Sequence, residues 1–300
     1  MFFENKKQCI WGLLFIFFFP QLDADKFVAI GDLHSGKTNY KTYYCDKILD
    51  LKIAYPEIDM ILISGDLTDS NKIISSTSGT WKEEQTVITD HSQWGILNSL
   101  WRAPLEAAGI EVKMSQGNHD QYYRLESENN MLQPISVADM LKYHYSTSYP
   151  DHQFTHYDFA YAFKKVNTYF ISCGVYPDGV IRGWLKSYLE DTVKTSPVFF
   201  FFHYPVCGKR GPEDFRDAFY NKIKNYNVGG IFTGHVKSFT YLWNGIPILS
   251  CGGKYFSVVD CDLSTGVIDL DETKFYGALN NTSDVFIEKG FYDPDLYGIE

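Results

Sequence analysis

The most informative stretch of the chain is Met60-Ile-Leu-Ile-Ser-Gly-Asp-Leu-Thr-Asp69. Its run of apolar residues is typical of a β-strand that is buried on both faces, as in a sheet with layers on either side. The Ser-Gly-Asp that follows ends the strand in a polar corner, and Asp66 and Asp69 bring carboxylates to it. Because ligands in open α/β sheets gather beyond the carboxyl ends of strands, this pattern predicts a buried strand that ends at a binding edge.

Other apolar runs, before and after this stretch, end in similar corners. The corners are Gly31-Asp-Leu-His34 after residues 27–30, Gly117-Asn-His-Asp120 after residues 112–114, His203 after residues 198–202, and Gly234-His235 after residues 230–232. Apolar residues at helical spacing predict helices around residues 44–55, 94–101, 184–189 and 215–226, the second broken at Pro104. After residue 236, turns with Gly separate β-rich runs. Together these patterns predict an α/β fold with helices outside packed sheets.

The composition excludes several classes of protein. Of the 300 residues, 45% are hydrophobic and 21% are charged, which rules out a disordered, coiled-coil or collagen-like chain. The formal net charge of −10 repels nucleic acid and anionic lipid, so we expect neither as a partner. No repeat or linker interrupts residues 25–270, so we expect one domain there. Residues 271–300 are expected to form a C-terminal tail that packs on this domain or extends from it.

Residues 1–24 have the pattern of a signal peptide. Lys6 and Lys7 precede an apolar run at residues 9–19, which Pro20 ends and which is shorter than the roughly twenty residues of a spanning helix. Leu22-Asp-Ala24 offers a cleavage site, and an uncleaved anchor is the alternative. No later stretch is long and apolar enough to span a bilayer.

Entry into a secretory pathway affects how the remaining cysteines and sequons are interpreted. The mature chain keeps an odd number of cysteines, so at least one stays unpaired or pairs between chains: Cys45, Cys173, Cys207, Cys251 and Cys261. Asn280 and Asn281 begin overlapping glycosylation sequons. We therefore expect a glycoprotein that is secreted or lies in the lumen of the secretory or endolysosomal pathway.

The strand-end corners gather oxygen and imidazole donors with no thiolate among them. The candidate metal ligands are Asp32, His34, Asp66, Asn118, His203 and His235. Such a set suits Zn, Fe, Mn or similar divalent or trivalent ions and differs from that of a structural zinc site. A single histidine is more often structural, but His34, His119, His203 and His235 all fall at these corners. This pattern predicts a metal centre.

With these motifs, the chain resembles the calcineurin-like metallophosphoesterase superfamily over roughly residues 27–260. The matching blocks are Asp32-Leu-His34, Gly65-Asp-Leu-Thr-Asp69, Gly117-Asn-His-Asp120, Phe202-His-Tyr-Pro205 and Gly234-His235, in the family's order. The resemblance implies a sandwich of two packed mixed β-sheets flanked by helices, in α-β-β-α layers. It also implies hydrolysis of a small phosphomonoester or phosphodiester by a metal-activated hydroxide.

Matched position by position, the resemblance implies two metal ions. Asp32 and His34 would hold the first ion and Asp66 would bridge it to the second. The second ion would be completed by Asn118, His203 and His235. A water shared by the ions would attack phosphorus.

The resemblance also implies roles in proton transfer and substrate binding. His119 would protonate the leaving alkoxide as general acid, and Asp69 would orient its ring. Asn118 and His119 would contact the substrate. For Asp69 and Asp120, a role as structural turn carboxylates is the alternative.

Departures from the family pattern disfavour two of the family's branches. Ser70-Asn71 stands where protein Ser/Thr phosphatases have Arg-Gly, and Asp69 stands where purple acid phosphatases have a tyrosine ligand. Small-molecule, nucleotide and lipid-headgroup phosphoesterases remain, so the substrate stays open, as does the oligomeric state.

The fifth block also departs from the family pattern, which is usually Gly-His-x-His. This chain has Gly234-His-Val-Lys237, and a protonated lysine has no lone pair with which to bind a metal. The second metal site is therefore expected to be tight and the first weak or absent. Lys237 either supplies a fixed positive charge near Asp32 or points to solvent.

Two alternatives to an active phosphoesterase follow from the sequence. The abnormal ligand position allows a weak or inactive member of the fold that serves as a binding module. Residues 31–38 also match the phosphate-binding loop of a P-loop NTPase. That interpretation leaves Asn118, His203 and His235 unexplained.

The first prediction concerns the compartment. We expect the mature chain to begin near Asp25 and to carry sugar on Asn280 or Asn281, because the signal pattern directs it into a compartment where sequons are glycosylated. N-terminal sequencing and glycosidase treatment check this. An unglycosylated protein that retains Met1 would contradict it.

Overall fold

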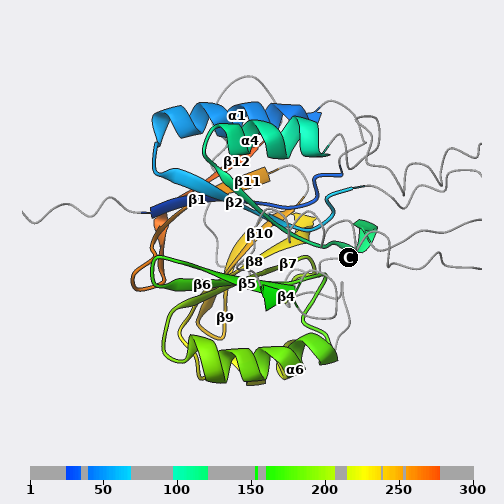
Figure 1. The fold of residues 1–300 in the computed structure, drawn as a ribbon, viewed down its shortest axis with the longest axis vertical. Helices are drawn as coiled ribbons and strands as arrows, with labels where there is room; N and C mark the ends of the chain where they lie inside the picture. The colour runs from blue at the N-terminus through cyan, green and yellow to red at the C-terminus, as the bar shows by residue number, and fades with distance from the viewer. Residues whose placement is uncertain are drawn as a thin grey trace, which may run out of the picture.

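The computed structural model describes residues 25–34, 40–68, 97–120, 153–154, 160–206, 215–237, 239–252 and 255–277. These residues form two mixed β-sheets that pack face to face (Figure 1). The five-stranded sheet has the order β12 (Val267–Gly277), β11 (Tyr255–Asp262), β1 (Asp25–Ile30), β2 (Ile58–Ser64) and β3 (Glu111–Ser115). The seven-stranded sheet has the order β4 (Gln153–Phe154), β5 (Ala160–Lys165), β6 (Thr168–Cys173), β7 (Val198–Phe202), β8 (Val228–Lys237), β10 (Ile246–Gly252) and β9 (Phe239–Trp243).

Helices cover the outer face of each sheet. Figure 1 shows α1 (Tyr40–Ala54) and α4 (Ala103–Ala107) over the five-stranded sheet and α6 (Gly179–Tyr188) over the seven-stranded sheet. The helix α7 (Phe215–Ile223) packs beside α6 on the same core. The predicted α-β-β-α sandwich is confirmed. No helix among the described residues is long and apolar enough to cross a membrane.

Alternating phenylalanines in β7 show how the layers hold together. Phe199 faces the other sheet, where its ring lies 6.1 Å from that of Phe27. Phe200 and Phe202 face the opposite way, and their rings lie 5.3 and 5.6 Å from that of Phe219 on α7. Because successive strand residues point to opposite faces, one fully apolar strand fills both the core between the sheets and the core under the helices.

The sequence predicted that the helix before β3 is broken at Pro104, but in the structure the helix continues through this residue. A π-helical turn, η1 (Asn98–Arg102), runs directly into α4, with Pro104 in the first turn of that helix. Proline lacks an N–H and its ring crowds the carbonyl four residues earlier, here that of Leu100. The wider π turn places the Ala103 N–H on the Asn98 carbonyl, so the helix continues through the proline.

The last strand continues past residue 271, the expected start of the C-terminal tail, and ends at Gly277. Asn280 and Asn281 lie outside the described residues, as does Cys207. Four other cysteines, Cys45, Cys173, Cys251 and Cys261, are buried free thiols. Burial raises the pKa of Cys251 to about 12, so this thiol is unreactive at neutral pH.

The loops after β1, β2, β3 and β7 meet the last residues of β8 at one edge of the sandwich. Backbone hydrogen bonds tie them together: Asp32 N–H donates to the Gly65 carbonyl (3.0 Å), and Gly234 N–H donates to the His203 carbonyl (3.0 Å). Left-handed backbone recurs at this edge in residues other than glycine, with φ of 55° at Asp32, 49° at Asp66 and 67° at His235. Such conformations cost free energy and persist where the surroundings enforce them, often at functional sites.

Glycine allows these loops to approach one another closely. A Cβ at Gly117 would overlap the backbone nitrogen and the carboxylate of Asp66, and one at Gly234 would press on the Ser64 carbonyl. Only a residue without a side chain fits at either place. The two glycines therefore set the distance between the corners.

Asp120 joins the corner after β2 to the corner after β3. Its buried carboxylate accepts hydrogen bonds from the backbone N–H groups of Leu67 (3.1 Å), Thr68 (2.8 Å) and Gly117 (2.8 Å), and from the Thr68 hydroxyl (2.9 Å). These donors come from both loops, so one side chain fixes their separation. A role as a structural turn carboxylate, the alternative given for Asp120, accounts for these contacts.

We predict that Asp120→Ala lowers the free energy of unfolding by about 3 kcal/mol or more, because it leaves several buried N–H groups without acceptors. Asp120→Asn should cost less, since it keeps one carbonyl oxygen. Asp262→Ala is the matched control: Asp262 also accepts several hydrogen bonds, but at an exposed turn where water can replace it. Urea unfolding measures all three, and equal losses for Asp120→Ala and Asp262→Ala would contradict the assignment.

Candidate metal centre

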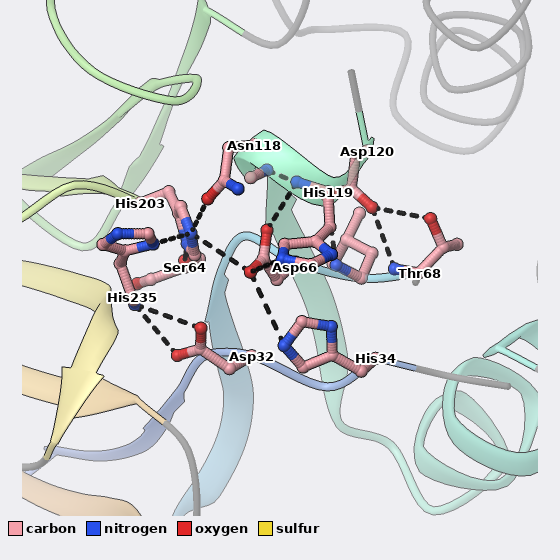
Figure 2. A network of polar contacts seen from close by, with 12 residues as sticks. Asp32, His34, Ser64, Asp66, Thr68, Asn118, His119, Asp120, His203 and His235 are labelled. Atoms are coloured by element: carbon pink, nitrogen blue, oxygen red, sulfur yellow. Dashed lines mark hydrogen bonds and ion pairs between the residues drawn. The ribbon is translucent and has the colours of Figure 1, made fainter. Parts of the chain in front are cut away.

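The predicted donors come together at the edge where the strands end (Figure 2). Asp32 and His34 follow β1, Asp66 follows β2, and Asn118 and His119 lie in the short 3₁₀ helix η2 (Asn118–Asp120) after β3. His203 follows β7. His235 lies in a bulge of β8, where the pairing with β10 shifts between Ser250 and Gly252. Both sheets thus contribute to one cluster.

Asp66 lies at the centre of this cluster and is 2% exposed. Its Oδ2 lies 3.3 Å from Nε2 of His203, 3.6 Å from Nε2 of His34 and 3.9 Å from Nε2 of His119. Its Oδ1 accepts a hydrogen bond from the His119 backbone N–H at 2.9 Å. One carboxylate oxygen therefore faces three imidazoles while the other is held by the backbone.

The hydrogen bond of His203 to the backbone defines the state of its ring. Nδ1 lies 2.9 Å from the Ser64 carbonyl, and because a carbonyl can only accept, Nδ1 carries a proton and donates it. In the neutral ring Nε2 then presents a lone pair. Nε2 lies 2.8 Å from Asn118 Oδ1 and 3.1 Å from His235 Nδ1. Atoms with lone pairs that converge in this way repel one another unless a cation or a proton lies among them.

The pKa values of His203 and Asp66, which form a buried pair, also indicate that the cluster favours a positive charge. Burial by itself would lower the pKa of His203, but the Asp66 carboxylate raises it to about 9. Burial by itself would raise the pKa of Asp66, but the His203 side chain holds it well below its usual value. The interior of the cluster therefore favours positive charge, which is a requirement of a cation site.

Two overlapping groups of donors could each hold a metal ion. One consists of Asp66, His203 and His235, and the other of Asp66, His34 and His119; within each group the ligand atoms lie within 4.8 Å of one another. Asn118 Oδ1 adjoins the group of Asp66, His203 and His235, since it lies 2.8 Å from His203 Nε2. Asp66 belongs to both, which is the arrangement needed for a carboxylate that serves two ions. The donors are oxygen and imidazole, so the residues present fit transition-metal or zinc ions.

Asp32, an expected metal ligand, also has a contact with the backbone that the sequence did not indicate. Its two carboxylate oxygens both lie within hydrogen-bond distance of the His235 backbone N–H, at 3.2 and 2.9 Å. It belongs to neither donor group. In the structure Asp32 therefore fixes the left-handed bulge that presents the His235 ring.

Some sequence-predicted residues lie outside what the structure describes. Asp69 follows the described segment that ends at Thr68. Lys237 is the last residue of β8 and its backbone pairs with Gly252, but its side chain is not described. Of the segment that matches a phosphate-binding loop, residues 31–34 are described, and Asp32 and His34 take part in the cluster. The described part of this segment therefore contributes side chains to the donor cluster, a role different from that of a phosphate-binding loop.

Two contributors to the site were missed from the sequence. The Ser64 carbonyl orients His203, and a backbone role leaves no signal in the residue type. Tyr204 packs against the His235 ring, with 4.6 Å between the ring centroids and an interplanar angle of 80°. Its position directly after His203 was the available signal.

Comparisons with known proteins agree with this geometry. The family model of calcineurin-like phosphoesterases matches residues 25–239. Among curated proteins, none matches the chain at a significant level. The protein TT1561 of Thermus thermophilus has a similar structure, with 12% identity, a TM-score of 0.50, and coverage of 85% of this chain and 100% of that chain. The 5′-nucleotidase from Candida albicans gives 10% identity and a TM-score of 0.50, over 86% of this chain and 52% of that chain.

A third similar structure is GAP50, the anchor in the inner membrane complex of Plasmodium. It shares 15% identity with a TM-score of 0.49, over 91% of this chain and 92% of that chain. At these identities TT1561 and the 5′-nucleotidase show the fold alone. The family model, in contrast, spans every corner that carries a donor, from β1 to the bulge of β8. The chain therefore belongs to the calcineurin-like phosphoesterase family.

Proposed function

We propose that this protein is a metal-dependent phosphoesterase that hydrolyses a small phosphorylated substrate, a phosphomonoester or a phosphodiester. The observation that carries the proposal is the position of Asp66, whose buried carboxylate is shared by two groups of imidazole donors. A structural core needs no such convergence of lone pairs.

The second site has the fuller set of donors. Asp66, Asn118, His203 and His235 would hold its ion, and the Ser64 carbonyl keeps Nε2 of His203 available for it. Asp32, His34 and Asp66 would hold the first ion, and Asp32 also fixes His235 through the backbone N–H of that residue. When bound, these ions would act as Lewis acids towards the phosphoryl oxygens. They would also lower the pKa of a bound water to near neutrality.

His119 is suited to act as the general acid. The hydrogen bond from its backbone N–H to Asp66 holds its main chain, and its side chain is 24% exposed, so the ring is open to a substrate. The ring packs edge-to-face on that of His34, with centroids 4.7 Å apart. Asp69, which follows the loop after β2 in sequence, would orient the ring. Asn118 and His119 would both contact the substrate.

We predict that His119→Ala leaves bound metal unchanged and slows hydrolysis of alkyl phosphates by about 10²- to 10⁴-fold. Activated aryl phosphates should be affected much less, because their leaving groups depart without a proton. Asp66→Asn is the matched control and should abolish hydrolysis of both and lower the metal content.

Metal analysis and turnover with both kinds of ester distinguish these results. An equal loss on both substrates would contradict the general-acid role. A loss of metal in His119→Ala would make His119 a ligand, as its place in a donor group with His34 and Asp66 also allows.

The two metal sites are proposed to differ in affinity. The family pattern would complete the first site with a histidine at position 237, where this chain has lysine. An ammonium group cannot bind a metal while it stays protonated. The first site therefore has fewer available donors than the second.

We predict that metal titration of the purified protein gives about one tightly bound equivalent of Zn²⁺ or Mn²⁺. Lys237→His should strengthen a second equivalent, and His203→Ala should remove the tight one. Lys186→His, which adds a histidine at an exposed position on α6, is the matched control and should change neither. Two equally tight equivalents in the unmodified protein would contradict this asymmetry.

A binding module without turnover is the second candidate function, and Lys237 is the observation that favours it. The two candidates are separated by a screen of a generic phosphomonoester, a diester, nucleotides and lipid headgroups alongside metal analysis. Turnover with any ester supports the enzyme, whereas a protein that takes up no metal favours the module. For either function we propose a secreted or luminal location, on the N-terminal pattern of residues 1–24.

A further inference from the structure

Two buried serines link the sheets next to the donor cluster. Ser115, the last residue of β3, donates a hydrogen bond from its hydroxyl to the Gly174 carbonyl at 2.9 Å. Because its proton is used in that bond, its oxygen accepts from the Ser172 hydroxyl of β6 at 2.8 Å. Both serines are fully buried. Buried hydroxyls are costly unless they are hydrogen-bonded, so each serine stabilises the burial of the other.

The Gly174 carbonyl connects this link to two of the donors. It also accepts from the His203 backbone N–H, which is shared between Gly174 and Val175 at 3.2 Å each. Ser115 stands three residues before Asn118, at the base of the loop that carries this donor. The serine link therefore ties the loop with Asn118 to the backbone of His203. Between the ends of these two side chains, Asn118 Oδ1 lies 2.8 Å from His203 Nε2.

A second hydroxyl lies on the other side of the strand that leads to His203. Ser64 pairs with Ser115 where β2 and β3 end, and its hydroxyl donates to the Phe232 carbonyl of β8 at 3.3 Å. In the seven-stranded sheet, β7 lies between β6 and β8. The strand before His203 is therefore flanked by two hydroxyl links to the five-stranded sheet, one from Ser115 and one from Ser64.

We propose that Ser115 and Ser172 are positioning residues for the second metal site. Acting through the Gly174 carbonyl, they set the distance between Asn118 and His203. This inference rests on the proposed function, because it takes these donors to hold a metal ion. Residues that orient metal ligands typically change metal affinity by roughly 10- to 100-fold when they are replaced. A link that served stability alone would affect unfolding and leave the metal affinity of the folded protein unchanged.

The experiment measures the dissociation constant of the tightly bound Mn²⁺ for the purified protein by calorimetry. Ser115→Ala should raise this constant by about tenfold, because it removes the donor that holds the Gly174 carbonyl. It should also change the visible absorption of the Co²⁺-loaded protein, which depends on the geometry of the ligands. Ser172→Ala is the second variant. It keeps the bond from Ser115 to Gly174 and should raise the constant by a smaller factor.

Thr168→Val is the matched control. Thr168 lies on the same strand, is also fully buried, and also links the sheets, because its hydroxyl donates to the Leu263 carbonyl after β11 at 2.6 Å. This link lies at the end of β6 opposite the donor cluster. Thr168→Val should lower the urea midpoint of the metal-free protein as Ser115→Ala does, but it should leave the Mn²⁺ constant and the Co²⁺ spectrum unchanged.

The results separate a positioning role from a structural one. A less stable Ser115→Ala protein with an unchanged Mn²⁺ constant and Co²⁺ spectrum would overturn the inference, as would an equal loss of affinity in Thr168→Val. If Ser115→Ala does not fold, an unchanged constant in Ser172→Ala overturns it in the same way.

A separate hydrolysis assay tests the proposed function. Mn²⁺ binding that is weakened in Ser115→Ala, in a protein that turns over no ester, would support the positioning role and contradict the proposed function. Turnover by a protein whose Mn²⁺ affinity is the same with and without the Ser115 hydroxyl would leave the function standing and overturn the positioning role. An unmodified protein that binds no Mn²⁺ would overturn both.

Discussion

The arrangement of the site depends on the convergence of lone pairs on one point beside Asp66. The Ser64 carbonyl accepts a hydrogen bond from Nδ1 of His203. In the neutral ring the unprotonated nitrogen, Nε2, therefore faces Asn118, His235 and Asp66. Nitrogen and oxygen acceptors at such distances in a buried place repel one another unless a metal ion or a proton lies between them. The fold holds them there through bonds and close contacts that lie outside the donors themselves.

These supporting contacts bring the two sheets together. Asp120 joins the corners after β2 and β3, and Asp32 holds the bulge of β8 by its backbone. Gly117 and Gly234 allow the loops to touch. The left-handed conformations at Asp32, Asp66 and His235 are the cost of bringing these loops to one place, and hydrogen bonds across the corners offset it. The phenylalanines between the sheets provide the rigid frame on which this local strain can persist.

Much of this arrangement can be predicted from the sequence, because parallel strands place their carboxyl ends at one edge. The apolar runs therefore identified both the strands and the donors that follow them. The hairpin of β5 and β6 was missed, because its turn at Val166-Asn167 lacks the usual glycine and puts a β-branched residue at a φ of 53°. The continuous helix through Pro104 was also missed, since a π turn has no clear sequence signal.

The finer contacts of the site could not be predicted from sequence patterns, because they depend on tertiary structure. Asp32 also accepts a hydrogen bond from the His235 N–H, and this contact depends on a bulge that only tertiary structure defines. The Tyr204 ring likewise meets His235 across two strands of the sheet. Residue types indicate which chemistry is available, whereas the direction of each side chain is set by loops that are remote in sequence.

The central claim is that the cluster around Asp66 is a cation site, and anomalous X-ray diffraction from crystals grown with Mn²⁺ tests it most directly. The account predicts an anomalous peak bounded by Asp66, Asn118, His203 and His235, with the Nδ1 hydrogen bond of His203 to Ser64 intact. A map with no peak among these residues, and with His203 Nε2 still in direct contact with Asn118 Oδ1, would contradict it.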